Sequence, residues 1–136
     1  MDNKIRLDIV TPYGLILSED VDELTATGTE GEFGVLPGHV PFITTLSIGM
    51  LIIKKDGKTE CVFVSSGYAE VTFEKVVILA DSAERSCDID IDRAVAARKR
   101  AEERLAQAEK VDFARATAAV ERATIRVQVA EKKSAR

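Results

Sequence analysis

The sequence predicts an α+β chain, mainly β, in which a β-sandwich or barrel precedes an antiparallel two-helix hairpin. Residues 1–86 carry short apolar runs with a period of two, as strands do. After Arg85 the apolar period changes to steps of three and four in an Ala-rich segment. The charge changes there too, from 7 Lys and Arg against 14 Asp and Glu in residues 1–86 (net −7) to 12 against 9 in residues 87–136 (net +3). We therefore predict two domains, 1–86 and 87–136.

The first half reads as a series of short strands. Ile5, Leu7 and Ile9 alternate with Arg6 and Asp8, which indicates a strand with one buried face. Glycine, proline or aspartate separates the later candidates. These further strands are predicted at residues 13–17, 21–27, 48–54, 59–65, 68–73 and 76–80.

A hairpin is predicted at Lys55-Asp56-Gly57-Lys58, because Asp-Gly supplies the positive φ angles of a two-residue type I′ turn. The flanking strands differ from the first one. Residues 50–53 and the pair Phe63 and Val64 are apolar on both faces, which predicts strands covered on both sides.

Residues 28–42 are rich in turn-forming residues and predict an ordered, exposed loop. Two interpretations remain open: a sheet crossover with structural glycines, or a docking surface that presents Glu30 and Glu32. His39, the single histidine, would make either a structural hydrogen bond or a partner contact.

Asp88, Asp90 and Asp92 precede the Ala-rich segment, where carboxylates favour a helix N-terminus. A first helix to about Ala108 is predicted, and a second starting near Asp112, with a turn around Lys110-Val111 between them. Their facing stripes are Ala94, Ala97, Ala101, Leu105 and Ala108, and Phe113, Ala116, Val120, Ala123, Val127 and Ala130. Alanine buries little area, so we expect a weakly held hairpin whose helices can separate and stay helical.

Five arginines recur at helical spacing in the hairpin. If the helices pair, the two stripes would converge with no carboxylate close enough to neutralise them all, and guanidinium groups bind phosphate bidentately. The alternative is a solvated basic face with pairs such as Arg98–Glu102, and Asp90 serving only as a helix cap. The arginines are Arg93, Arg100, Arg115, Arg122 and Arg126.

Several function classes are disfavoured. His39 has no nucleophile or acid/base partner nearby in sequence, and Cys61 and Cys87 lack metal-ligand spacing, so no catalytic residue and no metal site are predicted. A P-loop ending at Gly57-Lys58-Thr59 would need a glycine where Ile52 stands. The net charge of −4 and the lack of aromatic residues among the arginines argue against nucleic acid. No membrane span or targeting peptide is predicted.

The chain resembles the epsilon subunit of bacterial and plastid F-type ATP synthases, the counterpart of the mitochondrial delta subunit, over nearly its whole length. The motifs that carry the resemblance are EGEFGVLPGHVP at residues 30–41, GYAEV at 67–71, ILAD at 78–81 and IDIDRA at 89–94. The resemblance implies a flattened ten-stranded β-sandwich followed by two helices.

The resemblance also implies a function. Such a subunit is a non-catalytic part of the rotor, or central stalk, of a proton-driven enzyme, peripheral at the cytoplasmic face of the bacterial inner membrane. Its sandwich would bind the gamma subunit and the c-ring, with Glu30, Glu32 and His39 at or near the c-ring. Its hairpin would extend toward the alpha/beta catalytic head and block ATP hydrolysis.

Some members of that family bind ATP as a regulatory ligand in the folded hairpin, and no cofactor is required. The resemblance places the ligand at Asp90, Arg93, Arg100, Arg115, Arg122 and Arg126, with Glu84 contributing in some members. Two rivals remain: a structural stalk adaptor with an immobile hairpin, and a free-standing ATP-sensing module.

Overall fold

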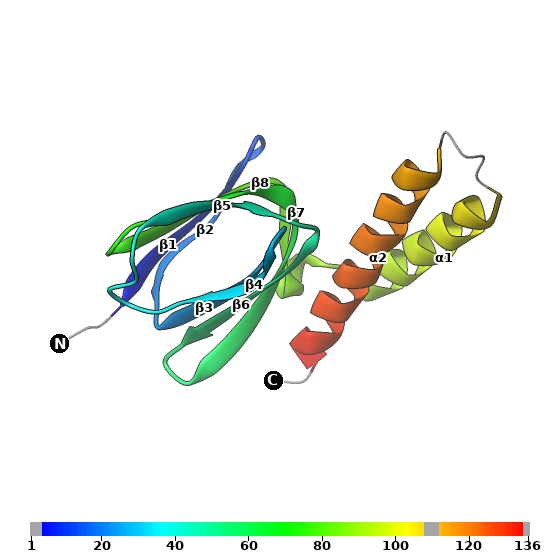
Figure 1. Cartoon of the computed structure of the whole chain (residues 1–136). Helices are drawn as coiled ribbons and strands as arrows, with labels where there is room; N and C mark the ends of the chain where they lie inside the picture. The colour runs from blue at the N-terminus through cyan, green and yellow to red at the C-terminus, as the bar shows by residue number, and fades with distance from the viewer. Residues whose placement is uncertain (1–3, 108–111, 135–136) are drawn as a thin grey trace.

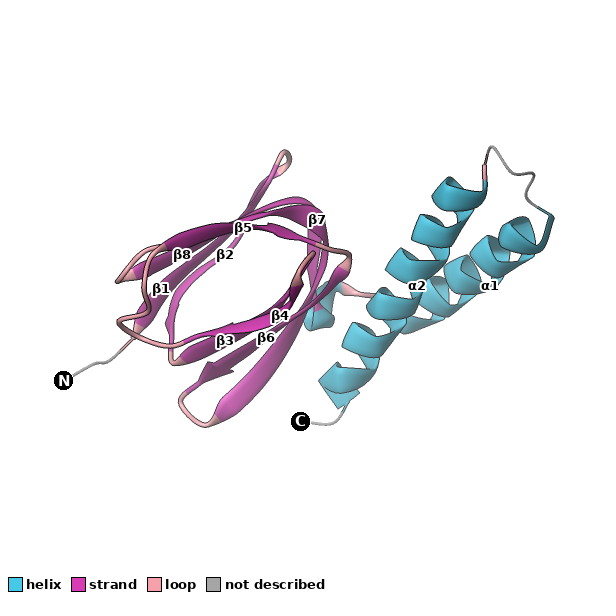
Figure 2. Cartoon of the chain, viewed as in Figure 1, coloured by secondary structure: helices cyan, strands magenta, loops and turns pink. Residues whose placement is uncertain are grey.

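The structure is a computed structural model that describes residues 4–107 and 112–134. Eight strands form one body, and a helical hairpin lies beside it (Figures 1 and 2). The strands are β1 (Ile5–Thr11), β2 (Gly14–Val21), β3 (Glu23–Gly28), β4 (Gly31–Val35), β5 (Phe42–Leu46), β6 (Gly49–Lys55), β7 (Lys58–Val71) and β8 (Lys75–Arg85). A 3-10 turn, η1 (Ser86–Asp88), leads into helices α1 (Ile91–Gln107) and α2 (Phe113–Ser134).

The strands form a flattened sandwich in two layers. The sheet order is β2-β1-β8-β7-β5-β3-β4, and β6 pairs with β3 and β7. All pairs are antiparallel except β1 with β8. Figure 1 shows β1, β2, β5 and β8 in one layer and β3, β4 and β6 in the other, joined through β7. The core between the layers includes Leu7, Ile9, Leu24, Leu51, Ile53, Val62 and Ile78, all almost fully buried. The predicted fold class is confirmed.

Strand β7 bends from one layer into the other without a break. Its bend lies at Ser66 and Gly67, which have φ of 52° and 145°. A Cβ atom at Gly67 would collide with the carbonyl oxygen of Leu79 on β8. The strands predicted at 59–65 and 68–73 are therefore one strand, and the described residues contain eight strands where the resemblance implied ten.

The predicted hairpin between β6 and β7 is confirmed. Asp56 and Gly57 have φ of 51° and 80°, and Lys55 pairs with Lys58 around them. Both faces of these strands are covered, as their apolar pattern indicated. Leu51 and Val62 point into the sandwich core, whereas the alternate positions, which include Phe63, lie beneath α2.

The prediction of one exposed loop over residues 28–42 is wrong in part. Residues 31–35 form β4, which pairs with β3 along its length, and β5 starts at Phe42. The glycines of β4 hide its alternation, and only pairing with β3 stabilises it as a strand. The exposed loop is thus limited to residues 36–41.

Both helices begin at the predicted caps. The Asp90 carbonyl accepts the Ala94 N–H at 3.0 Å, and its Oδ1 accepts the Arg93 N–H at 3.2 Å. The Asp112 carbonyl accepts the Ala116 N–H at 3.0 Å. Each helix therefore starts one residue after an aspartate.

The helices pair through the predicted alanine-rich stripes. Ala94 and Ala101 of α1 are buried, as are Ala123, Val127 and Ala130 of α2. One predicted seam residue is misplaced: Phe113 is 57% exposed at the first turn of α2. The expected contribution of Ala108 and the turn at Lys110-Val111 lie outside the described residues.

A second apolar cluster joins the hairpin to the sandwich and is distinct from the sandwich core. It contains Cys61 and Phe63 of β7, Ile89, Ala94 of α1, and Val127, Val129 and Ala130 of α2, with Ile48, Met50, Ile52 and Ile125 packed around it. Among the described residues the cluster has seven buried members against nineteen in the sandwich core, so the contact that holds the hairpin down is the smaller of the two. The sandwich keeps its own core without it.

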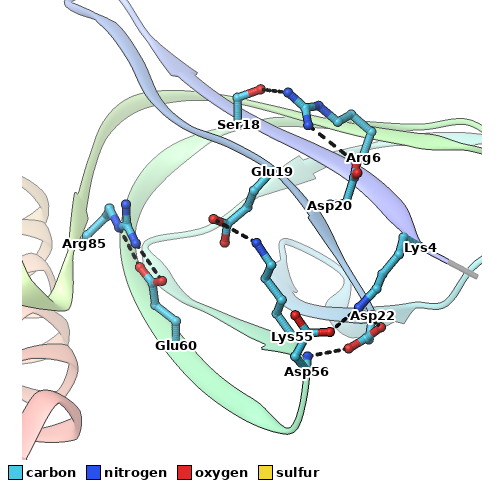
Figure 3. Close-up of polar contacts among 10 residues, drawn as sticks. All are labelled: Lys4, Arg6, Ser18, Glu19, Asp20, Asp22, Lys55, Asp56, Glu60 and Arg85. Atoms are coloured by element: carbon cyan, nitrogen blue, oxygen red, sulfur yellow. Dashed lines mark hydrogen bonds and ion pairs between the residues drawn. The ribbon is translucent and has the colours of Figure 1, made fainter. Parts of the chain in front are cut away.

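Ion pairs link β2 and the segment before β1 to the hairpin of β6 and β7, and Lys55 Nζ lies 3.7 Å from Glu19 Oε2 on β2 (Figure 3). The Lys4 ammonium lies 2.6 Å from Asp22 Oδ1 and 2.8 Å from Asp56 Oδ1. The hydrogen bond from Lys4, together with the Asp56 backbone N–H, holds the pKa of Asp22 below its usual range. The Arg85 guanidinium donates two hydrogen bonds, of 2.7 and 2.9 Å, to the Glu60 carboxylate.

Candidate functional site

A groove of about 440 Å³ lies where β8, η1, α1 and α2 meet. That volume lies within the range of small-molecule sites, roughly 300 to 1,000 Å³. Every segment on its rim contributes a charged side chain. Its lining residues are Glu84, Asp88, Ile89, Asp90, Arg93, Ala94, Ala97, Arg100 and Arg126.

Arg126 of α2 connects the groove to the sandwich. Its Nε lies 3.2 Å from Glu84 Oε1 on β8, and its Cζ lies 4.4 Å from the centre of the Phe63 ring on β7. Phe63 and Glu84 are direct partners in the β7–β8 register. A single helical side chain therefore contacts two paired sandwich residues.

The α1 side of the groove places two guanidinium groups above small residues. Arg93 and Arg100 are exposed and lie two turns apart, so they share one helix face. Ala94 and Ala97 leave room beside them. Asp90 is the cap of the same helix, and its carboxylate binds the Arg93 backbone N–H. The pair predicted on the solvated face also forms, with Arg98 Nε 3.7 Å from Glu102 Oε1.

The structure gathers only part of the predicted arginine set. Arg93, Arg100 and Arg126 line the groove, whereas Arg115 and Arg122 lie farther toward the N-terminus of α2 and do not. Three carboxylates line the same groove, and one of them, on β8, lies 3.2 Å from Arg126 Nε. These are Glu84, Asp88 and Asp90.

The predicted docking residues are spread along the sandwich rather than clustered. Glu30 lies in the β3–β4 turn and Glu32 on β4, both exposed, while His39 lies in the loop beyond the other end of β4. His39 makes structural contacts: its Nδ1 is 2.9 Å from the Val40 carbonyl oxygen, and its ring centre is 5.1 Å from that of Phe42.

An apolar row on the outer face of the sandwich was not foreseen. Leu15 of β2, Leu79 of β8 and Tyr68 of β7 lie in register across the sheet and are 62%, 47% and 56% exposed. Ile43 of β5 and Tyr13, in the β1–β2 turn, are also exposed. The hairpin contacts β6, β7 and η1, and it leaves this row uncovered. The signal was the presence of apolar residues at outward positions of the predicted strands.

The described residues contain neither a metal site nor a membrane-spanning helix. In residues 4–107 and 112–134 no group of three or more His, Cys, Asp and Glu side chains is arranged to hold a metal ion. None of the helices, so far as they are described, is long and apolar enough to cross a membrane.

Comparison with protein families decides the relationship. Residues 4–86 match the model of the ATP synthase delta/epsilon chain β-sandwich domain, and residues 88–131 match that of its long α-helix domain. The chain belongs to the ATP synthase delta/epsilon family. It is therefore a non-catalytic subunit, as predicted.

Individual relatives of this delta/epsilon chain are close. The ATP synthase epsilon chain of Nitratidesulfovibrio vulgaris strain DP4 is 60% identical over 115 residues, which cover 84% of this chain and 86% of that one. The ATP synthase epsilon chain of Thermodesulfovibrio yellowstonii is 52% identical over 109 residues, which cover 80% and 78%. The suspected resemblance is confirmed.

A solved structure shares the fold of this delta/epsilon chain. A chain in the Euglena gracilis mitochondrial ATP synthase, solved as OSCP/F1/c-ring, gives a TM-score of 0.79 at 24% identity, covering all of this chain and 84% of that one. A chain in the Tetrahymena thermophila central stalk/c-ring structure gives 0.57 at 16% identity, covering 96% of each. At these identities the likeness establishes the fold.

Proposed function

We propose that this chain is a central-stalk, or rotor, subunit of a proton-driven F-type ATP synthase. It couples c-ring rotation to the catalytic head and inhibits ATP hydrolysis when its helices extend. ATP bound to the folded hairpin would favour the docked, non-inhibiting state. The observation that carries the regulatory part is the groove, which is complete only while the hairpin lies against the sandwich.

The groove draws its charged residues from three parts of the chain. Glu84 comes from β8. The segment that runs from η1 into α1 supplies Asp88, Asp90, Arg93 and Arg100, and α2 supplies Arg126. Extension of the helices would separate these residues. A ligand that needs all three parts must therefore bind the docked state more tightly, and it shifts the equilibrium by that difference in affinity.

The chemistry of the groove suits a phosphate-bearing ligand that also has neutral donors. Three guanidinium groups can bind phosphate oxygens. The carboxylates repel phosphate, but they can accept hydrogen bonds from hydroxyl or amino groups of the same ligand. A nucleotide offers both kinds of group. Arg115 and Arg122 would extend the basic row along α2 beyond the groove.

The partners follow from the two other surfaces. The exposed row of Leu15, Tyr68 and Leu79 suits an apolar partner surface, which we assign to the gamma subunit. The edge from Glu30 and Glu32 to His39 would meet the c-ring, and the extended basic helices would contact the alpha/beta head. The two structural neighbours come from assemblies described as OSCP/F1/c-ring and as central stalk/c-ring. The subunit would lie peripherally at the cytoplasmic face of a bacterial inner membrane.

Assembled enzyme with and without residues 87–136 tests the regulatory role, because the sandwich keeps its own core. Removal should raise ATP hydrolysis at low ATP and have little effect at high ATP, where the hairpin is docked. If removal of residues 87–136 leaves the hydrolysis rate unchanged at low ATP and at high ATP, the result would instead support a structural adaptor with an immobile hairpin. A stable monomer that never associates with gamma would support a free-standing sensor.

The ligand site is tested by calorimetric titration with ATP. Arg93→Ala should weaken binding about tenfold or more, because a charge-assisted hydrogen bond contributes about 1.5 to 3 kcal/mol. Arg122→Ala, one turn of α2 from Arg126, should weaken it less. Arg98→Ala is the matched control, since Arg98 pairs with Glu102 outside the groove. Unchanged affinity in Arg93→Ala would exclude the groove as the ATP site.

A further inference from the structure

Phe63 lies outside the groove but contacts the one groove residue that belongs to α2. Its ring is fully buried, and the Arg126 guanidinium covers it at 4.4 Å. Such a contact between a cation and an aromatic face is favourable, and more so when it is partly desolvated. The Arg126 side chain is 29% exposed.

Glu84 restrains the same guanidinium from the neighbouring strand. Because Phe63 and Glu84 face each other across β7 and β8, their side chains rise on the same side of the sheet. The Phe63 ring limits the plane of the guanidinium, and Glu84 fixes its Nε edge at 3.2 Å. Together they orient the remaining N–H donors of Arg126, which has five in a rigid fork.

We infer that Phe63 is a positioning residue that couples docking of α2 on β7 to ligand binding in the groove, acting through Arg126. The inference rests on the proposed ATP-binding function. When α2 leaves the sandwich, Arg126 loses the aromatic face and the carboxylate together, and the groove loses its oriented guanidinium. Phe63 thereby acts on a groove that its own side chain does not line.

The test has a nucleotide-free arm on the full-length chain with Cys87→Ser, because Cys87 is exposed. The Cys61 thiol is buried beneath α2 in the same cluster as Phe63, so its alkylation rate reports how often the hairpin lifts. Phe63→Leu and Arg126→Gln should each accelerate it. An unchanged rate in both variants would overturn the claim that this contact holds the hairpin, whether or not ATP binds.

The second arm is a double-mutant cycle measured by ATP titration. Phe63→Leu should weaken ATP binding about three- to tenfold in the native background and have almost no further effect in the Arg126→Gln background. Met50→Ala is the control, because Met50 packs on the same cluster from β6 and offers no aromatic face. Its effect should simply add to that of Arg126→Gln.

The outcomes separate the two claims. The positioning role is overturned if the effects of Phe63→Leu and Arg126→Gln on ATP affinity are additive. It is also overturned if Met50→Ala weakens ATP binding in the native background but not in the Arg126→Gln background. If the native chain does not bind ATP in the titration, the proposed function fails and the coupling to ATP fails with it. The alkylation rates then still decide whether the Arg126 contact holds the hairpin.

Discussion

Val129→Ala should release the hairpin without disturbing the sandwich. Val129 is fully buried in the cluster that joins α2 to β7, and it is not part of the core between the two sandwich layers. The substitution therefore weakens the contact between hairpin and sandwich selectively. It isolates the step on which regulation depends.

The expected size follows from the side chain that is lost. Two buried methyl groups contribute roughly 0.8 kcal/mol each, and the cavity that remains adds to this, for a total of about 2 kcal/mol. A change of about 2 kcal/mol shifts an equilibrium about 30-fold. We expect the population of the undocked hairpin to rise by about that factor.

The assay is the alkylation rate of Cys61 under native conditions, which should increase about 30-fold in Val129→Ala if opening is fast relative to the reaction. Val95→Ala is the matched control: it is the same substitution in the same hairpin, at a position of α1 that is 41% exposed. An equal increase in both variants, or none in Val129→Ala, would refute the idea that this cluster holds the hairpin down.

Two further predictions concern the sandwich. Gly67→Ala should lower the free energy of unfolding by about 2 to 5 kcal/mol, because its Cβ meets the Leu79 carbonyl and its φ is 145°. Gly38→Ala, with φ of 81° and open space around it, should cost less, and denaturant unfolding that ranks the two equally would contradict this. Lys4 lowers the pKa of Asp22, so the pair stabilises the fold above the usual carboxyl pKa, and this is lost as pH falls through the lowered value. Asp22→Asn should therefore reduce stability near neutral pH and flatten its acid dependence; parallel pH curves for the two proteins would count against the pair.

Most of the strands, turns and helices could be predicted because each is determined by residues within a few positions of one another in the sequence. The alternation of Ile5, Leu7 and Ile9 marks β1, and Asp56-Gly57 marks a turn that needs positive φ. Asp90 caps α1 through its side chain, which accepts the backbone N–H three residues on, and Asp112 stands directly before α2. None of these features depends on the rest of the chain.

The errors occurred where distant segments decide the structure. β4 has a weak pattern of its own and forms because β3 offers it a partner. Glu84 precedes Arg126 by 42 residues, so their pairing depends on how the hairpin docks. Arg122 shares the helical spacing of Arg126, but the place where α2 meets the sandwich decides which of the two lines the groove.

The apolar pattern on both faces of β6 and β7 was the one local signal of that docking. Outward positions such as Ile52 and Phe63 are apolar because α2 covers them. A pattern of this kind predicts that a cover exists, but it does not identify the covering helix. The contact of Arg126 with both Phe63 and Glu84 could be seen only in the three-dimensional structure.

The most direct measurement follows Cys61 alkylation in the Cys87→Ser chain across a range of ATP concentrations. Binding of ATP to the docked state alone predicts that the rate falls by the factor one plus the ratio of ATP concentration to its dissociation constant. The same dissociation constant should come from calorimetry, and Arg93→Ala should shift the curve to higher ATP. A rate that stays constant over concentrations at which ATP binds would show that the ligand and the hairpin are not linked.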